Sequence, residues 1–162
     1  MDEDSSIAKI QQIFSSKSDL VDRFASLWNE YGTIPKDYGS GIFLTQVESH
    51  TLKSIADNPG ITVTELASSG RRTKGAVSQV VKKLEQRKYI RRERCPVDGK
   101  RALLHVSEEG GRLSLLYRKY SVNDLRTTLD ALLERCDVAD VDTFFKVLDA
   151  YIGILESEMK KP

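Results

Sequence analysis

Cysteine and histidine are scarce in this sequence of 162 residues, which contains 2 of each. His50, Cys95, His105 and Cys136 are scattered along the chain without the spacing of metal ligands, so we do not expect a metal site. Two cysteines also cannot build a disulfide framework. Neither histidine belongs to a Ser-His-Asp or Cys-His arrangement with supporting context, and there is no glycine-rich phosphate loop. These absences argue against an enzyme and against a bound cofactor.

Long hydrophobic runs are absent too, and no segment of the sequence is long enough to cross a bilayer. The first residues, Met1-Asp2-Glu3-Asp4, are acidic, whereas a signal peptide starts with basic residues followed by an apolar stretch. We therefore expect a cytoplasmic protein with no membrane partner. Hydrophobic residues make up 40% of the chain and charged residues 30%, which is sufficient for one core beneath a well-solvated surface.

Charge is distributed unevenly although the net charge is only +1. The block from Arg71 to Arg101 holds 12 basic and 3 acidic residues, and the rest of the chain is acidic. A strongly basic block within an acidic remainder orients a molecule toward a polyanion. The distribution therefore indicates a nucleic-acid partner more clearly than the net charge does.

Apolar residues recur at three- and four-residue steps over residues 7–31, which predicts a long amphipathic helix that ends before the Gly32–Gly41 turn region. The same pattern after Ser107, with a kink near Ser121, predicts a second long helix, and Asp140 is predicted to cap a last one. A small centre cannot bury all of these apolar faces. We therefore predict that residues 1–31 and 107–162 are helical dimerisation arms.

The centre, residues 42–106, has the pattern of three short helices followed by a hairpin. Capping boxes at Thr45-Gln46-Val47-Glu48 and Thr62-Val63-Thr64-Glu65 predict the starts of two helices, and a third begins near Thr73. Residues 89–95 and 102–106 read as strands joined by a turn at 96–99. The predicted fold is thus mostly α with a small β-hairpin wing: a winged helix-turn-helix flanked by N- and C-terminal dimerisation helices.

The helix that begins near Thr73 has an apolar back and a small polar front, as a helix that enters a DNA major groove requires. Gly75 and Ser78 are small, while Lys74 and Gln79 carry donors for base edges, and Gln79 suits a bidentate contact with adenine. The predicted double-stranded DNA contacts are Arg71, Arg72, Thr73, Lys74, Gly75, Ser78, Gln79, Lys82, Lys83, Asp98, Lys100 and Arg101. Of these, Arg71, Arg72, Lys82 and Lys83 are assigned to phosphates, and Lys100 and Arg101 to a narrow minor groove.

Two stretches of the centre form a recognisable pattern: Asn58-Pro59-Gly60-Ile61-Thr62-Val63-Thr64-Glu65-Leu66-Ala67 and Thr73-Lys74-Gly75-Ala76-Val77-Ser78-Gln79-Val80-Val81-Lys82-Lys83-Leu84-Glu85. Both resemble the MarR family of winged helix-turn-helix bacterial transcription regulators. The wing Asp98-Gly99-Lys100-Arg101 and the following Val106-Ser107-Glu108-Glu109-Gly110 are similar to the family's Asp-x-Arg wing and to the start of its next helix.

The sequence departs from the family's pattern at three places. Gly70 and Arg72 stand where apolar residues are usual, which puts the packing of the turn in doubt. Lys88 stands where a glycine is usual, so the lysine either adopts a left-handed backbone or ends the helix differently. Lys100 occupies the arginine position of the wing and Arg101 follows it, which leaves open which of the two enters the groove.

The resemblance implies a homodimer, held by the terminal helices, that regulates transcription as a ligand-responsive repressor on an inverted-repeat operator. It also implies a site for a small, often aromatic, effector between the arms and the central lobe. The candidate pocket residues are Trp28, Tyr31, Tyr38, Leu113 and Tyr117.

Three further functions stay open from the sequence. Cys95 lies near Arg91, Arg92 and Arg94, and cations of this kind favour the reactive thiolate, so a thiol-responsive regulator is one alternative. A metal-responsive regulator of the same fold is another. A winged helix that binds only proteins is a third, although it would not require so basic a block.

Overall fold

A computed structural model describes residues 3–96, 98 and 101–161 of the chain. The chain divides into two compact units, residues 1–118 and residues 119–162, and each is described by itself. Helix α5 runs through the division, because it extends from Glu108 to Leu133. No helix in the described ranges is both long and apolar enough to span a membrane.

Helix α1, Glu3–Thr33, begins the first unit. Its apolar residues remain exposed: the fractions for Leu20, Phe24 and Trp28 are 59%, 53% and 57%. The helix meets α2 near its end, where Gly32 is buried and a Cβ atom in its place would lie 3.0 Å from Oε1 of Gln46. The apolar side chains predicted to form one face of residues 7–31 are therefore largely exposed, among them Leu20, Phe24 and Trp28.

Three short helices form the lobe of the first unit: α2 Gln46–Asp57, α3 Val63–Ser69 and α4 Lys74–Gln86. Both predicted capping boxes are present, with Thr45 and Thr62 as N-caps and Glu48 and Glu65 returning to the cap backbone. Thr73 caps α4, and its hydroxyl accepts from the amide of Ala76 at 3.2 Å. The helix starts predicted from local sequence are thus confirmed in this lobe.

Two small antiparallel sheets complete the first unit. The predicted hairpin is formed by β3, Ile90–Arg94, and β4, Ala102–Val106, with Arg92 opposite Leu104. Leu104 is fully buried and also bridges to Ile61, which ties the hairpin to the segment before α3. A second pair, β1 Lys36–Asp37 and β2 Phe43–Leu44, was not predicted and lies in the turn region after α1.

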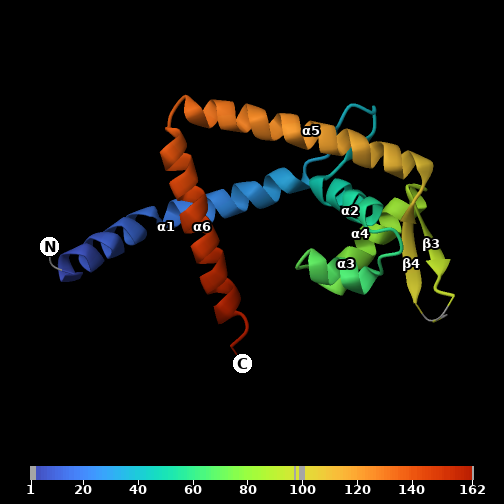
Figure 1. The fold of residues 1–162 in the computed structure, drawn as a ribbon, viewed down its shortest axis with the longest axis horizontal. Helices are drawn as coiled ribbons and strands as arrows, with labels where there is room; N and C mark the ends of the chain where they lie inside the picture. Colours follow the sequence, from blue (N-terminus) through green and yellow to red (C-terminus); the bar gives the residue numbers. More distant parts are fainter. Residues whose placement is uncertain (1–2, 97, 99–100, 162) are drawn as a thin grey trace. The chain divides into compact units, whose positions relative to one another are not determined.

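The core of the lobe is apolar and includes Leu52, Ile55, Val81, Leu84 and Leu104, all with no measurable exposure. Figure 1 shows α2, α3 and α4 gathered beside the β3–β4 hairpin, which extends from the group as the wing does in a winged helix. The predicted mostly-α fold with a small hairpin is therefore confirmed.

Helix α5 starts directly against the lobe. The hydroxyl of Ser107 accepts from the amide of Gly110 at 3.1 Å, as a helix cap does, and also donates to the carbonyl oxygen of Tyr89 at 3.1 Å. A Cβ atom at Gly110 would collide with that carbonyl oxygen and lie 2.9 Å from its carbon, so only glycine fits there. Further along α5, Arg118 pairs with Asp57 of α2.

The second unit comprises the rest of α5 and α6, Val138–Glu158. The helical assignment of α5 continues through Ser121, where a kink was predicted. The predicted cap of the last helix was wrong by three residues: Asp137 is the N-cap, and Asp140 returns to the backbone of Asp137 as the third residue of a capping box. No residue of α6 is buried.

Candidate nucleic-acid interface

Helix α4 presents two different faces. Val77, Val81 and Leu84 are buried in the lobe, while the opposite face is polar and exposed. Lys74, Gly75, Gln79 and Lys82 are exposed on this outer face, and Ser78 is half-buried beside them. This is the division between an anchored back and a free front that a groove-reading helix requires.

Gly75 lies in the first turn of α4, in open space. A Cβ atom added to it would have no atom of the protein within 4 Å, and its φ is not in the left-handed region. Neither packing nor backbone geometry within the described chain therefore requires glycine at this position. Its small size does, however, leave the backbone of α4 open to close approach from outside.

The turn between α3 and α4 is ordered by its backbone. The amide of Arg71 donates to Ser68 at 3.2 Å and that of Arg72 to Ala67 at 3.0 Å, with Arg71 in the left-handed region at φ 49°. These two bonds form a Schellman ending of α3, so the turn does not depend on apolar residues at positions 70 and 72. The side chains of both arginines are exposed beside the start of α4.

Lys88, which stands where the MarR family usually has a glycine, ends α4 with the same kind of motif. Lys88 adopts φ 63°, its amide donates to Glu85 at 2.9 Å, and the amide of Tyr89 donates to Leu84 at 3.0 Å. Helix α4 therefore ends with a Schellman motif in which a lysine holds the left-handed position that glycine would occupy more easily.

Several basic residues of the block are paired with carboxylates within the chain. Lys83 lies 2.7 Å from Oε1 of Glu48, and Arg101 lies 3.1 Å from Oε1 of Glu65. Arg92 pairs with Glu85 and Arg91 with Glu93. Among the described residues, by contrast, Arg72, Lys74 and Lys82 have no carboxylate partner. Cations without a carboxylate partner in the described chain thus remain at the start and the outer face of α4, and also at Lys88 after the helix and Arg94 on β3.

The wing is described only in part. Asp98 and Arg101 are exposed, and the amide of Arg101 donates to the carbonyl of Asp98 at 2.9 Å, which closes the turn of the hairpin. Lys100, the other predicted minor-groove residue, lies outside the described residues. Of the two candidates, Arg101 is therefore the one with an observed contact, and it is made to α3.

The residues predicted for an effector pocket fall into two groups. Tyr38, Leu113 and Tyr117 are buried, and the rings of Tyr38 and Tyr117 meet edge to face at 5.0 Å. Trp28 and Tyr31 are exposed on α1, where Trp28 stacks on Phe24 and the Lys36 ammonium lies over the Tyr31 ring. The structure thus brings Tyr38 and Tyr117 together, whereas an effector pocket that includes all five residues stays a prediction.

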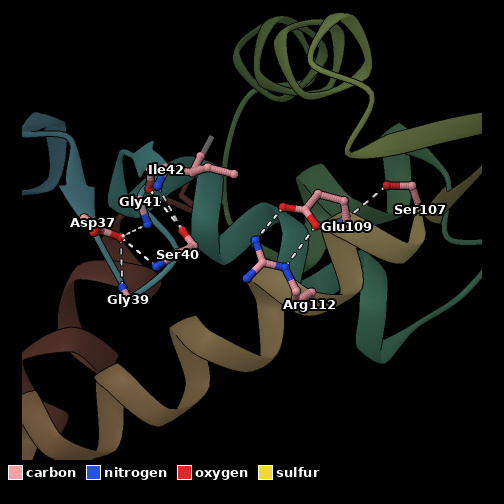
Figure 2. A network of polar contacts seen from close by, with 9 residues as sticks. Asp37, Gly39, Ser40, Gly41, Ile42, Ser107, Glu109 and Arg112 are labelled. Carbon is pink, nitrogen blue, oxygen red and sulfur yellow. Dashed lines mark hydrogen bonds and ion pairs between the residues drawn. The ribbon is translucent and has the colours of Figure 1, made fainter.

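An open depression of about 680 Å³ lies elsewhere, at the start of α5. It is lined by Lys88, Ser107, Glu108, Glu109, Gly111, Arg112 and Leu115 and by none of the predicted pocket residues. Arg112 is bound there to both oxygens of Glu109, and this pair lowers the pKa of the glutamate (Figure 2). Figure 2 also shows Asp37, whose carboxylate accepts three backbone amides, from Gly39, Ser40 and Gly41; these bonds lower its pKa and close the β1–β2 turn.

Two functional partners were missed from the sequence: Glu48 and Glu65. Each was recognised as the third residue of a capping box, and each performs that role with Oε2 while Oε1 contacts a basic residue predicted to bind DNA. The capping signal is local, whereas the partners lie 35 and 36 residues away, so nothing in the local sequence indicated them.

The two cysteines, on which a thiol-responsive regulator would depend, are both free thiols. Cys95 is half-buried on the hairpin side of the lobe, and Cys136 is exposed between α5 and α6. A metal-responsive regulator would need a cluster of ligands. Within the described ranges, no three His, Cys, Asp or Glu side chains gather closely enough to hold a metal ion.

The lobe matches a known family. The model of the MarR family matches residues 44–102. Transcriptional regulator HosA of Escherichia coli O111:H- is 30% identical over 70 residues, which cover 43% of this chain and 52% of HosA. The uncharacterized HTH-type transcriptional regulator YhjH of Bacillus subtilis (strain 168) is 29% identical over 96 residues, 59% of this chain and 55% of YhjH. The chain thus spans about half the length of the curated relatives it matches.

The fold has solved counterparts. The crystal structure of Streptococcus pneumoniae FabT in complex with DNA is similar at a TM-score of 0.63 and 20% identity, over 91% of this chain and 98% of the FabT chain. At this identity the likeness establishes the fold alone.

Proposed function

We propose that this chain is a MarR-family, double-stranded DNA-binding transcription regulator that acts as a homodimer on an inverted-repeat operator, because residues 44–102 match the model of that family. Both curated relatives bear the name of a transcriptional regulator, and FabT was crystallised with DNA. In this proposal the protein works in the cytoplasm, where bacterial DNA lies, and has no catalytic role.

The observation that carries the proposal is the outer face of α4. A helix is held by Val77, Val81 and Leu84 while its exposed face carries cations with no carboxylate partner in the described chain and one base-reading amide, Gln79. Unpaired cations bind phosphates by releasing counterions, and an amide side chain distinguishes adenine in the major groove. The helix therefore combines the two kinds of contact that sequence-specific binding requires.

The homodimer rests on the apolar surfaces of the helical arms. In the first unit, α1 exposes Ile10, Leu20, Phe24 and Trp28 by more than half of each residue. In the second unit, α6 buries no residue and exposes apolar side chains such as Phe144 and Phe145. Apolar stripes of this length on a monomer indicate an interface, and self-association through a two-fold axis is the commonest way to cover one.

The test of DNA binding measures the affinity for a mixed-sequence duplex at several salt concentrations. We expect log K to fall linearly with log salt, by about 0.9 for each phosphate that the protein neutralises. Selection from a random pool is then expected to recover an inverted repeat with half-sites about ten base pairs apart. An affinity that does not change with salt would refute the proposed function.

The test of assembly is sedimentation at micromolar concentration. We expect about twice the chain mass of 18.2 kDa for the wild type. Leu20→Glu places a charge on the exposed stripe of α1 and is expected to favour the monomer. Phe43→Glu is the matched control, because Phe43 is 61% exposed but lies on β2, outside the arms.

A further inference from the structure

Glu48 is a buried carboxylate with two separate duties. The residue is only 3% exposed. Its Oε2 accepts from the amide of Thr45 at 2.8 Å and so caps α2, while its Oε1 lies 2.7 Å from Nζ of Lys83 on α4. A buried charge without compensation is costly, so the lysine is required where the carboxylate is.

A second cation from the same helix adds to this contact. Nη1 of Arg87 lies 3.9 Å from Oε1 of Glu48, and its Nη2 donates to the carbonyl of Phe43 at 3.2 Å. Burial acts to raise the pKa of Glu48, but the nearby Lys83 ammonium and the capping bonds of Thr45 together lower it. The carboxylate is therefore ionised at neutral pH, and the C-terminal half of α4 is joined to the N-terminus of α2 by charge.

The preceding residue, Lys82, has a different environment. Successive residues of a helix are turned by about 100° from one another, and in the described chain the Lys82 side chain is exposed with no carboxylate partner. The sequence alone gives Lys82 and Lys83 the same phosphate-binding role. The Lys83 side chain is exposed as well, by 60%, so what distinguishes the two lysines is the buried carboxylate of Glu48 beside Lys83.

We propose that Lys83 is a positioning residue, which braces α4 against α2 through Glu48 and so sets the direction of the base-reading face, while Lys82 makes the phosphate contact. The proposal rests on the proposed DNA binding. Gln79 lies four residues before Lys83, one helical turn away, so a tilt of α4 about its buried face would displace the amide from a base edge. Base contacts require close geometry, whereas phosphate contacts tolerate small shifts.

The experiment compares Lys82→Met, Lys83→Met, Glu48→Gln and the double variant Glu48→Gln/Lys83→Met. For each variant, the affinity is measured for a duplex that the wild type enriched from a random pool and for a scrambled duplex of equal composition. The slope of log K against log salt on the scrambled duplex, called the salt slope, and the Tm are measured as well. Lys53→Met is the matched control, because Lys53 pairs with Asp57 on the surface of α2, outside both sets of contacts.

Lys82→Met is expected to reduce the salt slope by about one unit per monomer bound, and to weaken both duplexes equally. Lys83→Met is expected to leave the slope unchanged and to lower the ratio of enriched to scrambled affinity by about 5- to 150-fold, the size of one lost base contact. The double variant is expected to recover part of Tm and of this ratio, since it removes the buried charge that the single variant leaves unpaired.

Three results would overturn the proposal: a salt slope that falls for Lys83→Met as it does for Lys82→Met, a lowered Tm with an unchanged affinity ratio, or strictly additive effects in the double variant. If Lys83→Met does not fold, the double variant is used in its place, because it leaves no unpaired buried carboxylate. Its ratio of enriched to scrambled affinity then tests whether loss of the brace weakens base reading. A wild type without salt-dependent binding would instead contradict the proposed function, and the additivity of Tm would still test the brace.

Discussion

Arg101 of the wing donates from Nη2 to Oε1 of Glu65 on α3 at 3.1 Å. The same carboxylate accepts from the amide of Thr62 through Oε2 and so also caps α3. Both side chains are about half exposed, at 52% and 53%. In the Glu48–Lys83 pair, by contrast, the carboxylate is buried although the lysine side chain is 60% exposed. A pair that is exposed on both sides is weak, so in the proposed complex a DNA phosphate or base edge can replace the glutamate.

Glu65→Gln is therefore expected to strengthen DNA binding by about two- to fivefold, the range of a weak surface pair. Glutamine retains an oxygen for the cap and removes the charge that competes for Arg101. Fluorescence anisotropy with a labelled duplex measures the change. In an Arg101→Ala background the same substitution should gain less, and an equal gain there would mean that Arg101 is not the residue released.

Gly75→Ala is expected to separate stability from binding. Alanine in place of glycine stabilises a helix by about 0.5–1 kcal/mol, and the structure leaves room for the added methyl group. The Tm should therefore rise while the affinity for DNA falls, because the methyl group faces the groove. Lower affinity together with a lower Tm would instead indicate that the variant misfolds, and not that the methyl group keeps the α4 backbone away from the DNA.

Gln79→Ala is expected to cost about 1–3 kcal/mol on the selected site and to relax the preference at one position in each half-site. Arg101→Ala is expected to weaken binding without changing that position, and to reduce the preference for A·T-rich flanks. Selection experiments on both variants compare the two roles. If Arg101→Ala lost the base preference at a central position while Gln79→Ala kept the preference at every position, the roles of the two residues would be reversed.

Lys88→Gly is expected to stabilise the protein by about 1 kcal/mol. A non-glycine residue in the left-handed region is strained by about 1–2 kcal/mol, and part of the relief is lost to the greater freedom of glycine in the unfolded chain. The φ of 63° at Lys88 places it in this region. Denaturant unfolding measures the gain, and Lys88→Ala, which keeps the strain, should show none.

Stability is expected to fall as the pH drops below 6.5, because of His50. Partial desolvation of the imidazole, together with the positive charges of Arg72 and Lys53, lowers the pKa of His50 from 6.5, although the residue as a whole is exposed. The unfolded chain then binds a proton before the folded one does, so the stabilising contribution is complete above pH 6.5 and is lost as the pH falls through the folded pKa. Denaturant unfolding between pH 7.5 and 5 should show this slope, and His50→Gln should flatten it.

The helix starts of the lobe could be predicted because their signals are local. A hydroxyl at Thr45 or Thr62 and a glutamate three residues later satisfy the same backbone groups whatever surrounds them. At α6 the same rule failed, because Asp137 and Asp140 stand three residues apart and both are good caps. Sequence alone could not show that the second returns to the first.

The outer face of α4 was predicted from its period, but the partners of its cations were not. Lys82 and Lys83 are identical neighbours in the sequence, and only the fold brings Glu48 to one of them. The strands β1 and β2 were missed for a different reason: each has 2 residues, which is too short for an alternating pattern. Interactions between residues close in sequence can be predicted from the sequence, whereas pairs of residues that are distant in sequence require the structure.

The contact between Gly110 and Tyr89 has a mechanical consequence. Because the first turn of α5 rests on the backbone carbonyl of Tyr89, no side chain lies between them that could change rotamer and absorb a movement. Tyr89 is followed at once by Ile90, the first residue of β3, and preceded by the left-handed residue that ends α4. A rotation of the first turn of α5 would therefore shift Tyr89, and α4 and the β3–β4 hairpin, which adjoin Tyr89 on either side, would move together.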